Sequence, residues 1–141
     1  MKRIEWQPRL NLGVKQIDDQ HKRLVLLTNN LISAIQSGVA ADLLMEICIE
    51  LLEYTEYHFQ DEELLMQEVD FPYFNEHTAM HRVIEGKVRE YHDSVSKGAS
   101  VPPVKVLEFL GSWLVDHIIY ADMKIANHIR ESRSKEEEGL H

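Results

Sequence analysis

Residues 58–81 read HFQDEELLMQEVDFPYFNEHTAMH, and they carry two pairs of potential metal ligands. His58 and Glu62 are four residues apart, as are His77 and His81, so each pair would lie on one face of an α-helix. The aspartate and proline between the pairs favour a turn, which brings the end of one helix beside the start of the next. The stretch therefore predicts two antiparallel helices whose ligand pairs lie at the same end.

Helical segments extend from this stretch in both directions. Only six Gly and four Pro occur in 141 residues, and they cluster at a few places. Between them, apolar residues recur at spacings of three and four, as on a helix that faces the centre of a bundle. We predict one domain, an all-α, up-down-up-down four-helix bundle of residues 18–131. Its helices are expected at about 18–37, 41–68, 71–94 and 102–131, with an N-terminal arm (1–17) that packs on the bundle and a flexible tail (132–141).

The composition limits the classes of function. The formal net charge is -9, and the basic residues form no stripe of the kind that binds nucleic acid. No stretch approaches the roughly 20 apolar residues of a membrane span, and no apolar run follows the basic start. Cys48 is the single cysteine, so an internal disulfide is excluded, and we expect it to be packed in a helix. We therefore expect a cytoplasmic protein without a nucleic-acid partner.

Polar side chains interrupt the apolar faces of all four predicted helices. On the fourth helix, for example, His117 is in phase with Leu110 and Trp113. A buried imidazole needs partners for both ring nitrogens, and a buried carboxylate is costly unless it is paired or bound to metal. One such histidine would be explained as a hydrogen-bonded core residue, but a set of five is better explained by a shared metal site. The five are His21, His58, His77, His81 and His117.

The positions of these residues along the predicted helices place them at one end of the bundle. His21 lies near the start of the first helix, and His117 and Asp122 lie in the second half of the fourth. In an up-down-up-down bundle these ends coincide with the ligand pairs of the second and third helices.

Asp122 follows His117 by five residues. On a regular α-helix, two residues at this spacing would not face the same site. Five residues turn an α-helix through about 500°, so Asp122 would face about 140° away from His117. The apolar pattern nevertheless resumes at Asp122, Ile125 and Ile129, as if one residue had been added. We therefore predict a π-bulge between His117 and Asp122, a distortion that is frequent at functional sites.

The ordered series His, His-x3-Glu, His-x3-His, His-x4-Asp resembles the signature of the haemerythrin family. Trp6, GVKQIDDQH (13–21) and WLVDHIIYAD (113–122) are similar to the single-domain bacterial branch of that family, and the match covers nearly the whole chain. The resemblance implies reversible binding of molecular oxygen at a non-haem di-iron centre. It further implies oxygen storage, or delivery to an oxygen-consuming enzyme.

The resemblance also implies two unequal iron ions. One iron would be fully coordinated, whereas the other would keep one open position at which oxygen binds. The fully coordinated iron would be bound by His77, His81 and His117, the other by His21 and His58, and both would be bridged by Glu62, Asp122 and an oxo or hydroxo group.

An apolar pocket beside the open position would slow the entry of protons. Ile119 resembles a pocket position of the family, and a polar residue there should hasten autoxidation. The carboxylates of Asp61, Glu63 and Asp116 flank candidate ligands, and we interpret them as solvated helix surface rather than as partners of the imidazoles. The expected wall residues of the pocket are Leu24, Phe59, Trp113, Leu114 and Ile119.

Three classes of function fit such a centre. A free-standing oxygen carrier is favoured because the bundle fills the chain, which argues against the second class, a sensor or interaction module with an output domain. The third class, a di-iron oxidase or nitric oxide-handling enzyme, is disfavoured because imidazoles offset less iron charge than carboxylates and favour the ferrous state. We therefore expect no enzymatic activity. The same ligands could hold zinc or manganese, and we expect a monomer because no exposed apolar stripe is evident.

Overall fold

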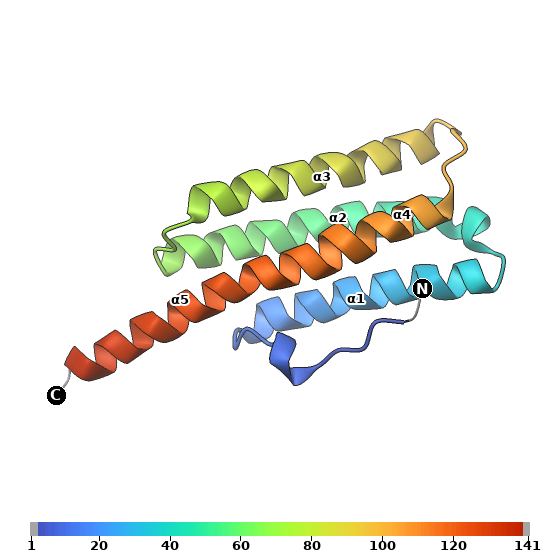
Figure 1. Cartoon of the computed structure of the whole chain (residues 1–141). Helices are drawn as coiled ribbons and strands as arrows, with labels where there is room; N and C mark the ends of the chain where they lie inside the picture. The colour runs from blue at the N-terminus through green and yellow to red at the C-terminus, as the bar shows by residue number, and fades with distance from the viewer. Residues whose placement is uncertain (1–2, 140–141) are drawn as a thin grey trace.

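The computed structural model describes the backbone of residues 3–139 and their side chains except those of 114–118 and 137–139. This part of the chain forms helices joined by short turns, with no strand. The long helices run antiparallel to their neighbours in sequence and pack side by side (Figure 1). The predicted all-α bundle is confirmed. Within the described residues, no helix combines the length and the apolar character needed to cross a membrane.

The first three long helices are regular α-helices. α1 spans Lys15–Gln36, α2 spans Ala40–Glu68 and α3 spans Phe74–Ser96. α1 begins earlier than the predicted residue 18, because Asp18 does not cap it from outside. Instead, the carboxylate of Asp18 lies within the helix and accepts hydrogen bonds from the N–H groups of the preceding loop, at 2.6 Å from Leu12 and 3.2 Å from Gly13.

The fourth long helix consists of three parts that follow one another in the same direction (Figure 1). α4 spans Pro103–Phe109, the π-helix η2 spans Leu110–His117 and α5 spans Ile118–Gly139. α5 projects beyond the ends of the other helices, so the predicted end near residue 131 is too early. The segment after residue 131 is rich in Glu, Lys and Arg, which favour a helix even without tertiary contacts.

The π-helix lies earlier in the fourth helix than the sequence predicts. The prediction of a π-bulge between His117 and Asp122 is wrong, because the segment from Ile118 onwards is α-helical. On a regular α-helix, the step from Leu110 to Asp122 would turn through about 1200° and leave the two residues about a third of a turn apart. A π-helix turns less per residue because its hydrogen bonds join i and i+5. It thereby removes the offset, and both Leu110 and Asp122 are buried.

The same change of phase moves Trp113 away from the interior. Trp113 is 45% exposed and lines a surface groove of ≈ 390 Å³ with Val83 and Phe109. Its predicted place in the wall of an inner pocket is therefore wrong.

Apolar residues fill the two ends of the bundle. The larger cluster, which includes Leu31, Leu51 and Ile84, lies where α1 and α3 end. Smaller clusters around Met66 and Ile17 lie where α1 and α3 begin. Along each long helix, buried polar residues come between the residues of the two ends, so the polar site is closed off by apolar packing on both sides.

The N-terminal arm runs beside α1 and covers one side of the bundle (Figure 1). It contains a short 3-10 helix, η1 (Pro8–Leu10). Ile4, Trp6 and Leu10 pack against the buried side chains of Val25 and Ile119, which come from α1 and α5. The arm thus seals the seam between the first and last helices.

Candidate metal centre

Six of the seven predicted ligands lie together inside the bundle. All six are buried, and they come from four helices. The side chains of His117 and of the predicted wall residue Leu114 lie outside the described residues. The six are His21 from α1, His58 and Glu62 from α2, His77 and His81 from α3, and Asp122 from α5.

The turn between α2 and α3 sets the relative heights of their ligand pairs. Asp70 adopts a φ of 52°, and the N–H of Phe71 bonds to the carbonyl of Met66 at 2.9 Å, which ends α2. The buried ring of Phe71 meets His77 edge to face, with centroids 6.2 Å apart. The turn therefore both reverses the chain and supports the first histidine of α3.

Glu62 directs its two oxygens to different histidines. Glu62 Oε2 lies 3.4 Å from His58 Nε2 and 3.9 Å from His21 Nε2. Glu62 Oε1 lies 2.6 Å from His77 Nε2 and 2.9 Å from His81 Nε2. The carboxylate thus lies between two pairs of imidazoles: His21 with His58, which we call the first group, and His77 with His81, the second group.

Asp122 divides its oxygens in the same way. Asp122 Oδ2 lies 2.7 Å from His21 Nε2 and 3.9 Å from His58 Nε2, whereas Oδ1 lies 2.9 Å from His77 Nε2. Each group of imidazoles therefore lies beside one oxygen of Glu62 and one oxygen of Asp122. Each group forms a set with these two carboxylates, and the potential ligand atoms of each set lie within 4.8 Å of one another.

Several atoms at the centre lack a hydrogen-bond partner although they are buried. They include His58 Nε2, Glu62 Oε2 and Asp122 Oδ1; the last of these lies close to His77 Nε2 but outside hydrogen-bond geometry. A buried polar atom left unpaired costs about 1–3 kcal/mol. Two divalent cations would satisfy these atoms, and imidazole with carboxylate is a donor set that suits Fe²⁺, Mn²⁺ or Zn²⁺. The residues present fit a pair of such ions.

The carboxylates and the burial of the site shift the pKa values of its groups in opposite directions. Burial disfavours the charged form of His77, but Asp122 and Glu62 more than offset it and raise its pKa to about 9. Burial would lower the pKa of His21, but Asp122, with smaller contributions from Glu62 and Asp18, more than offsets burial and raises this pKa. Burial lowers the pKa of His58 to about 3. Burial would raise the pKa of Asp122, but the hydrogen bond from His21 and the nearby His77 hold it well below its usual value.

Three of the predicted wall residues are buried. Leu24, Phe59 and Ile119 are almost inaccessible to solvent. The ring of Phe59 stacks on His81, with centroids 3.8 Å apart and planes within 6°, and it lies 5.6 Å from the ring of His58. Phe59 therefore contacts an imidazole of each group.

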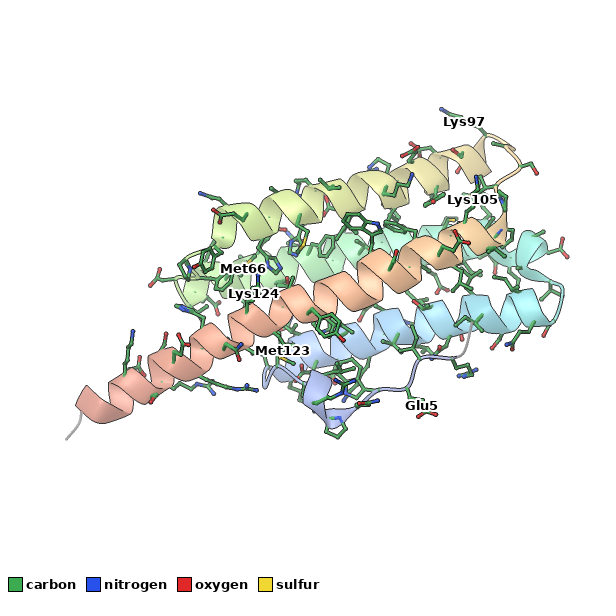
Figure 2. All side chains as sticks on the ribbon, in the orientation of Figure 1. Glu5, Met66, Lys97, Lys105, Met123 and Lys124 are labelled. Carbon is green, nitrogen blue, oxygen red and sulfur yellow. The ribbon has the colours of Figure 1, made fainter. Side chains whose placement is uncertain are left out.

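A surface pocket of ≈ 320 Å³ reaches His77 between α3 and α5. Tyr73, Met80 and Lys124 contribute to its walls. Figure 2 labels Lys124 at the same end of the bundle as Met66 of α2. The second group of imidazoles thus lies closer to solvent than the first on this side.

The sequence does not identify Gln20 as part of the site. Gln20 is buried, and its Oε1 accepts a hydrogen bond from His58 Nδ1 at 2.8 Å. Asp61 and Glu63 are also more than solvated surface, since Asp61 accepts a hydrogen bond from Gln20 and Glu63 lies 3.3 Å from His81 Nδ1. The side chain of Asp116 lies outside the described residues. One signal was present: Gln20 is a polar residue on the buried face of its helix.

The chain matches a known family and several named proteins. A family model described as Hemerythrin HHE cation binding domain matches residues 12–129. A protein named Bacteriohemerythrin from Pseudomonas aeruginosa (strain LESB58) is 33% identical over 135 residues, which cover 96% of this chain and 87% of that protein. Proteins of the same name from Stenotrophomonas maltophilia (strain R551-3) and Campylobacter jejuni (serotype O:6, strain 81116) are 32% and 31% identical. The matches cover 90% and 84% of this chain, and 82% and 90% of the respective relatives.

Proposed function

The chain belongs to the Hemerythrin HHE cation binding domain family, and we propose that it binds molecular oxygen reversibly at a centre of two non-haem iron ions. In this proposal it stores oxygen or delivers it to an oxygen-consuming enzyme. It is a carrier rather than an enzyme.

One observation carries the proposal. Glu62 and Asp122 each direct one oxygen to the first group of imidazoles and the other oxygen to the second group. A single ion would need only one such set of donors, whereas two carboxylates shared in this way are suited to bridging two ions. The arrangement therefore supports a dinuclear centre.

The two ions would have different numbers of protein ligands. The second group, His77 and His81, would be completed by His117. The first group, His21 and His58, has no third imidazole among the described residues. We therefore place the open position on the side of His21 and His58.

The ferrous ions would supply the electrons that reversible oxygen binding requires, and the protein side chains would control access to them. Leu24, Phe59 and Ile119 are buried, and in this proposal they line the centre and exclude water from it. The imidazole-rich ligand set stabilises the ferrous state, and a low local polarity slows proton entry. Both effects favour release of oxygen over its irreversible reduction.

The proposal is tested by anaerobic reconstitution of the metal-free protein with ferrous iron, followed by metal analysis and cycles of oxygen admission and removal. We expect two iron ions per chain and an optical change that appears with oxygen and reverses when oxygen is removed. Binding of one iron, or immediate and irreversible oxidation, would contradict the proposal.

A pair of histidine variants provides the control. His58→Ala removes a predicted ligand and should abolish the reversible change. His92→Ala removes a histidine of α3 that lies outside the cluster, beside Asp93, and should leave both iron content and oxygen response unchanged.

A further inference from the structure

A chain of hydrogen bonds leads from His58 to the surface of the bundle. His58 Nδ1 lies 2.8 Å from Gln20 Oε1. Gln20 Nε2 donates to Asp61 Oδ2 at 2.7 Å, and Gln16 Nε2 donates to the same oxygen at 2.6 Å. His58 and Gln20 are buried, Asp61 is half-buried and Gln16 is exposed. The chain thus links α1 with α2 and connects an imidazole of the first group to a carboxylate at the surface.

The carboxylate of Asp61 sets the direction of these hydrogen bonds. Because carboxylate oxygens only accept, the NH2 of Gln20 must face Asp61, and its carbonyl oxygen must face His58. His58 then donates from Nδ1, which leaves the lone pair of the neutral ring on Nε2. Nε2 points to the centre, where it lies 3.4 Å from Glu62 Oε2 without a hydrogen bond. The chain of hydrogen bonds therefore selects the tautomer that can bind a metal ion through Nε2.

The other imidazoles are supported differently. His81 Nδ1 lies 3.3 Å from Glu63 Oε2, and Glu63 in turn pairs with Arg82. His21 Nδ1 has no hydrogen-bond partner among the described residues. In the first group, His58 is thus the imidazole whose ring is oriented by a partner outside the centre, and that partner is a neutral amide held by a carboxylate.

We propose that Gln20, itself held by Asp61, is a positioning residue for His58 and strengthens binding of the metal ion at the first group. The amide keeps Nδ1 protonated and fixes the plane of the ring, so that Nε2 faces the metal without further rotation. Partners of this kind contribute about 10–100-fold to metal affinity. The effect on affinity rests on the proposed dinuclear centre, whereas the orientation of His58 does not.

Three variants test this role. Gln20→Met keeps the length of an unbranched side chain but removes the amide. Asp61→Asn removes the carboxylate at the half-buried end of the chain of hydrogen bonds. Asp19→Asn is the control, because it removes the same charge from an exposed residue of α1 that pairs with Lys15 at 3.0 Å.

The first measurement is ¹⁵N NMR of the histidine rings in the metal-free protein. Wild type and Asp19→Asn should show His58 as the tautomer with a proton on Nδ1. Gln20→Met should move the proton towards Nε2, which can then donate to Glu62. A merely structural role of Gln20 would not produce this change of tautomer.

The second measurement is competition for Zn²⁺ with a chelator of known affinity. Wild type and Asp19→Asn should bind two zinc ions. In Gln20→Met one ion should be held about 10–100-fold more weakly while the other is unchanged, and Asp61→Asn should show a smaller effect of the same kind.

Each outcome decides between the two proposals. An unchanged tautomer with unchanged zinc affinity in Gln20→Met would overturn the positioning role and leave the dinuclear centre intact. An equal loss of affinity for both zinc ions would also overturn the positioning role, since the effect would not be confined to the first group. If wild type itself bound fewer than two zinc ions, the proposed function would fail, and the tautomer would still decide the role of Gln20. If Gln20→Met did not fold, Asp61→Asn would give the answer.

Discussion

At the scale of single residues, Glu62 has the most contacts in the described cluster. Its two oxygens lie within 3.9 Å of the Nε2 atoms of all four described histidines of the cluster. Asp122 lies near three of them. A change at Glu62 should therefore affect both groups of imidazoles at once.

Glu62→Gln should abolish tight binding of two metal ions. The amide offers one oxygen instead of two and carries no charge, so one group loses its shared donor and the other binds less strongly. Residues that only support a metal ligand already contribute about 10–100-fold to metal affinity. Loss of a predicted ligand such as Glu62 should therefore lower the metal affinity by more than about 100-fold. Anaerobic equilibrium dialysis with Fe²⁺ and metal analysis would measure it. Glu53→Gln, at an exposed position of α2, should bind as wild type does; two tightly held ions in Glu62→Gln would contradict its role.

Metal binding should release protons in a way that depends on pH. The pKa of His77 is raised to about 9, so its imidazole is protonated at about pH 7.5 in the metal-free protein. A metal ion binds the unprotonated nitrogen and must displace that proton. At about pH 9.5 the imidazole is already neutral, so fewer protons should be released. Calorimetric titration with Zn²⁺ in two buffers of different ionisation enthalpy counts them. Equal proton release at the two pH values would refute the raised pKa of His77, and His77→Gln should reduce the difference.

At the scale of elements, the arm is attached to α1 mainly through one side chain. The buried Asn29 accepts a hydrogen bond from the N–H of Ile4 at 2.7 Å and donates to its carbonyl at 2.9 Å. These two bonds hold the start of the arm against α1, which lets Trp6 and Leu10 reach Val25 and Ile119.

Asn29→Ala should loosen the arm. With about 0.5–1.5 kcal/mol for each lost hydrogen bond, the free energy of unfolding should fall by about 1–3 kcal/mol. Urea denaturation gives this value, and limited proteolysis should cut the arm sooner. Asn30→Ala replaces an exposed neighbour and should change stability by less than about 0.5 kcal/mol. Equal stability of the two variants would mean that the arm does not depend on Asn29.

Much of the arrangement of the elements follows from helical periodicity. The spacing of His58 with Glu62, and of His77 with His81, is a local property, and the short turn at Asp70 leaves few ways to place one helix beside the other. The proximity of the six buried residues was therefore predictable. Their role as iron ligands stays a prediction.

The features that the sequence did not predict depend on contacts between distant segments. Gln20 has no ligand signature, and it becomes part of the site only because α2 places His58 and Asp61 against it. Trp113 fits an α-helical apolar pattern, but the π-helix rotates it outwards. The position of a π-helix depends on which residues the neighbouring helices accept, and the pattern of one helix does not contain that information.

At the scale of the whole molecule, a polar centre divides the apolar core. Six buried imidazoles and carboxylates occupy the space between the larger apolar cluster and the smaller ones. Without ions, such groups hold one another through hydrogen bonds and leave several atoms unpaired. Bound ions should therefore stabilise the entire fold.

Removal of the metal should lower the midpoint of thermal unfolding. Free metal at about a hundred times its Kd stabilises the folded state by about 2.7 kcal/mol. For a domain of this size, that corresponds to about 5–10 °C. Scanning calorimetry of the zinc-loaded protein with and without chelator would measure the difference. Chelator should have much less effect on Glu62→Gln, and an equal shift in both proteins would contradict the link between the centre and the fold.

The origin of the clustered residues in four helices has a consequence for biosynthesis. His21 and the Asp122 with which it pairs are separated by 101 positions. A ribosome adds Asp122 only after all four described histidines of the cluster and Glu62 have been translated. The complete set of buried imidazoles and carboxylates can therefore form only after α5 has been synthesised. An ion that needs the complete set would then bind only to a chain that has been synthesised and folded as far as α5.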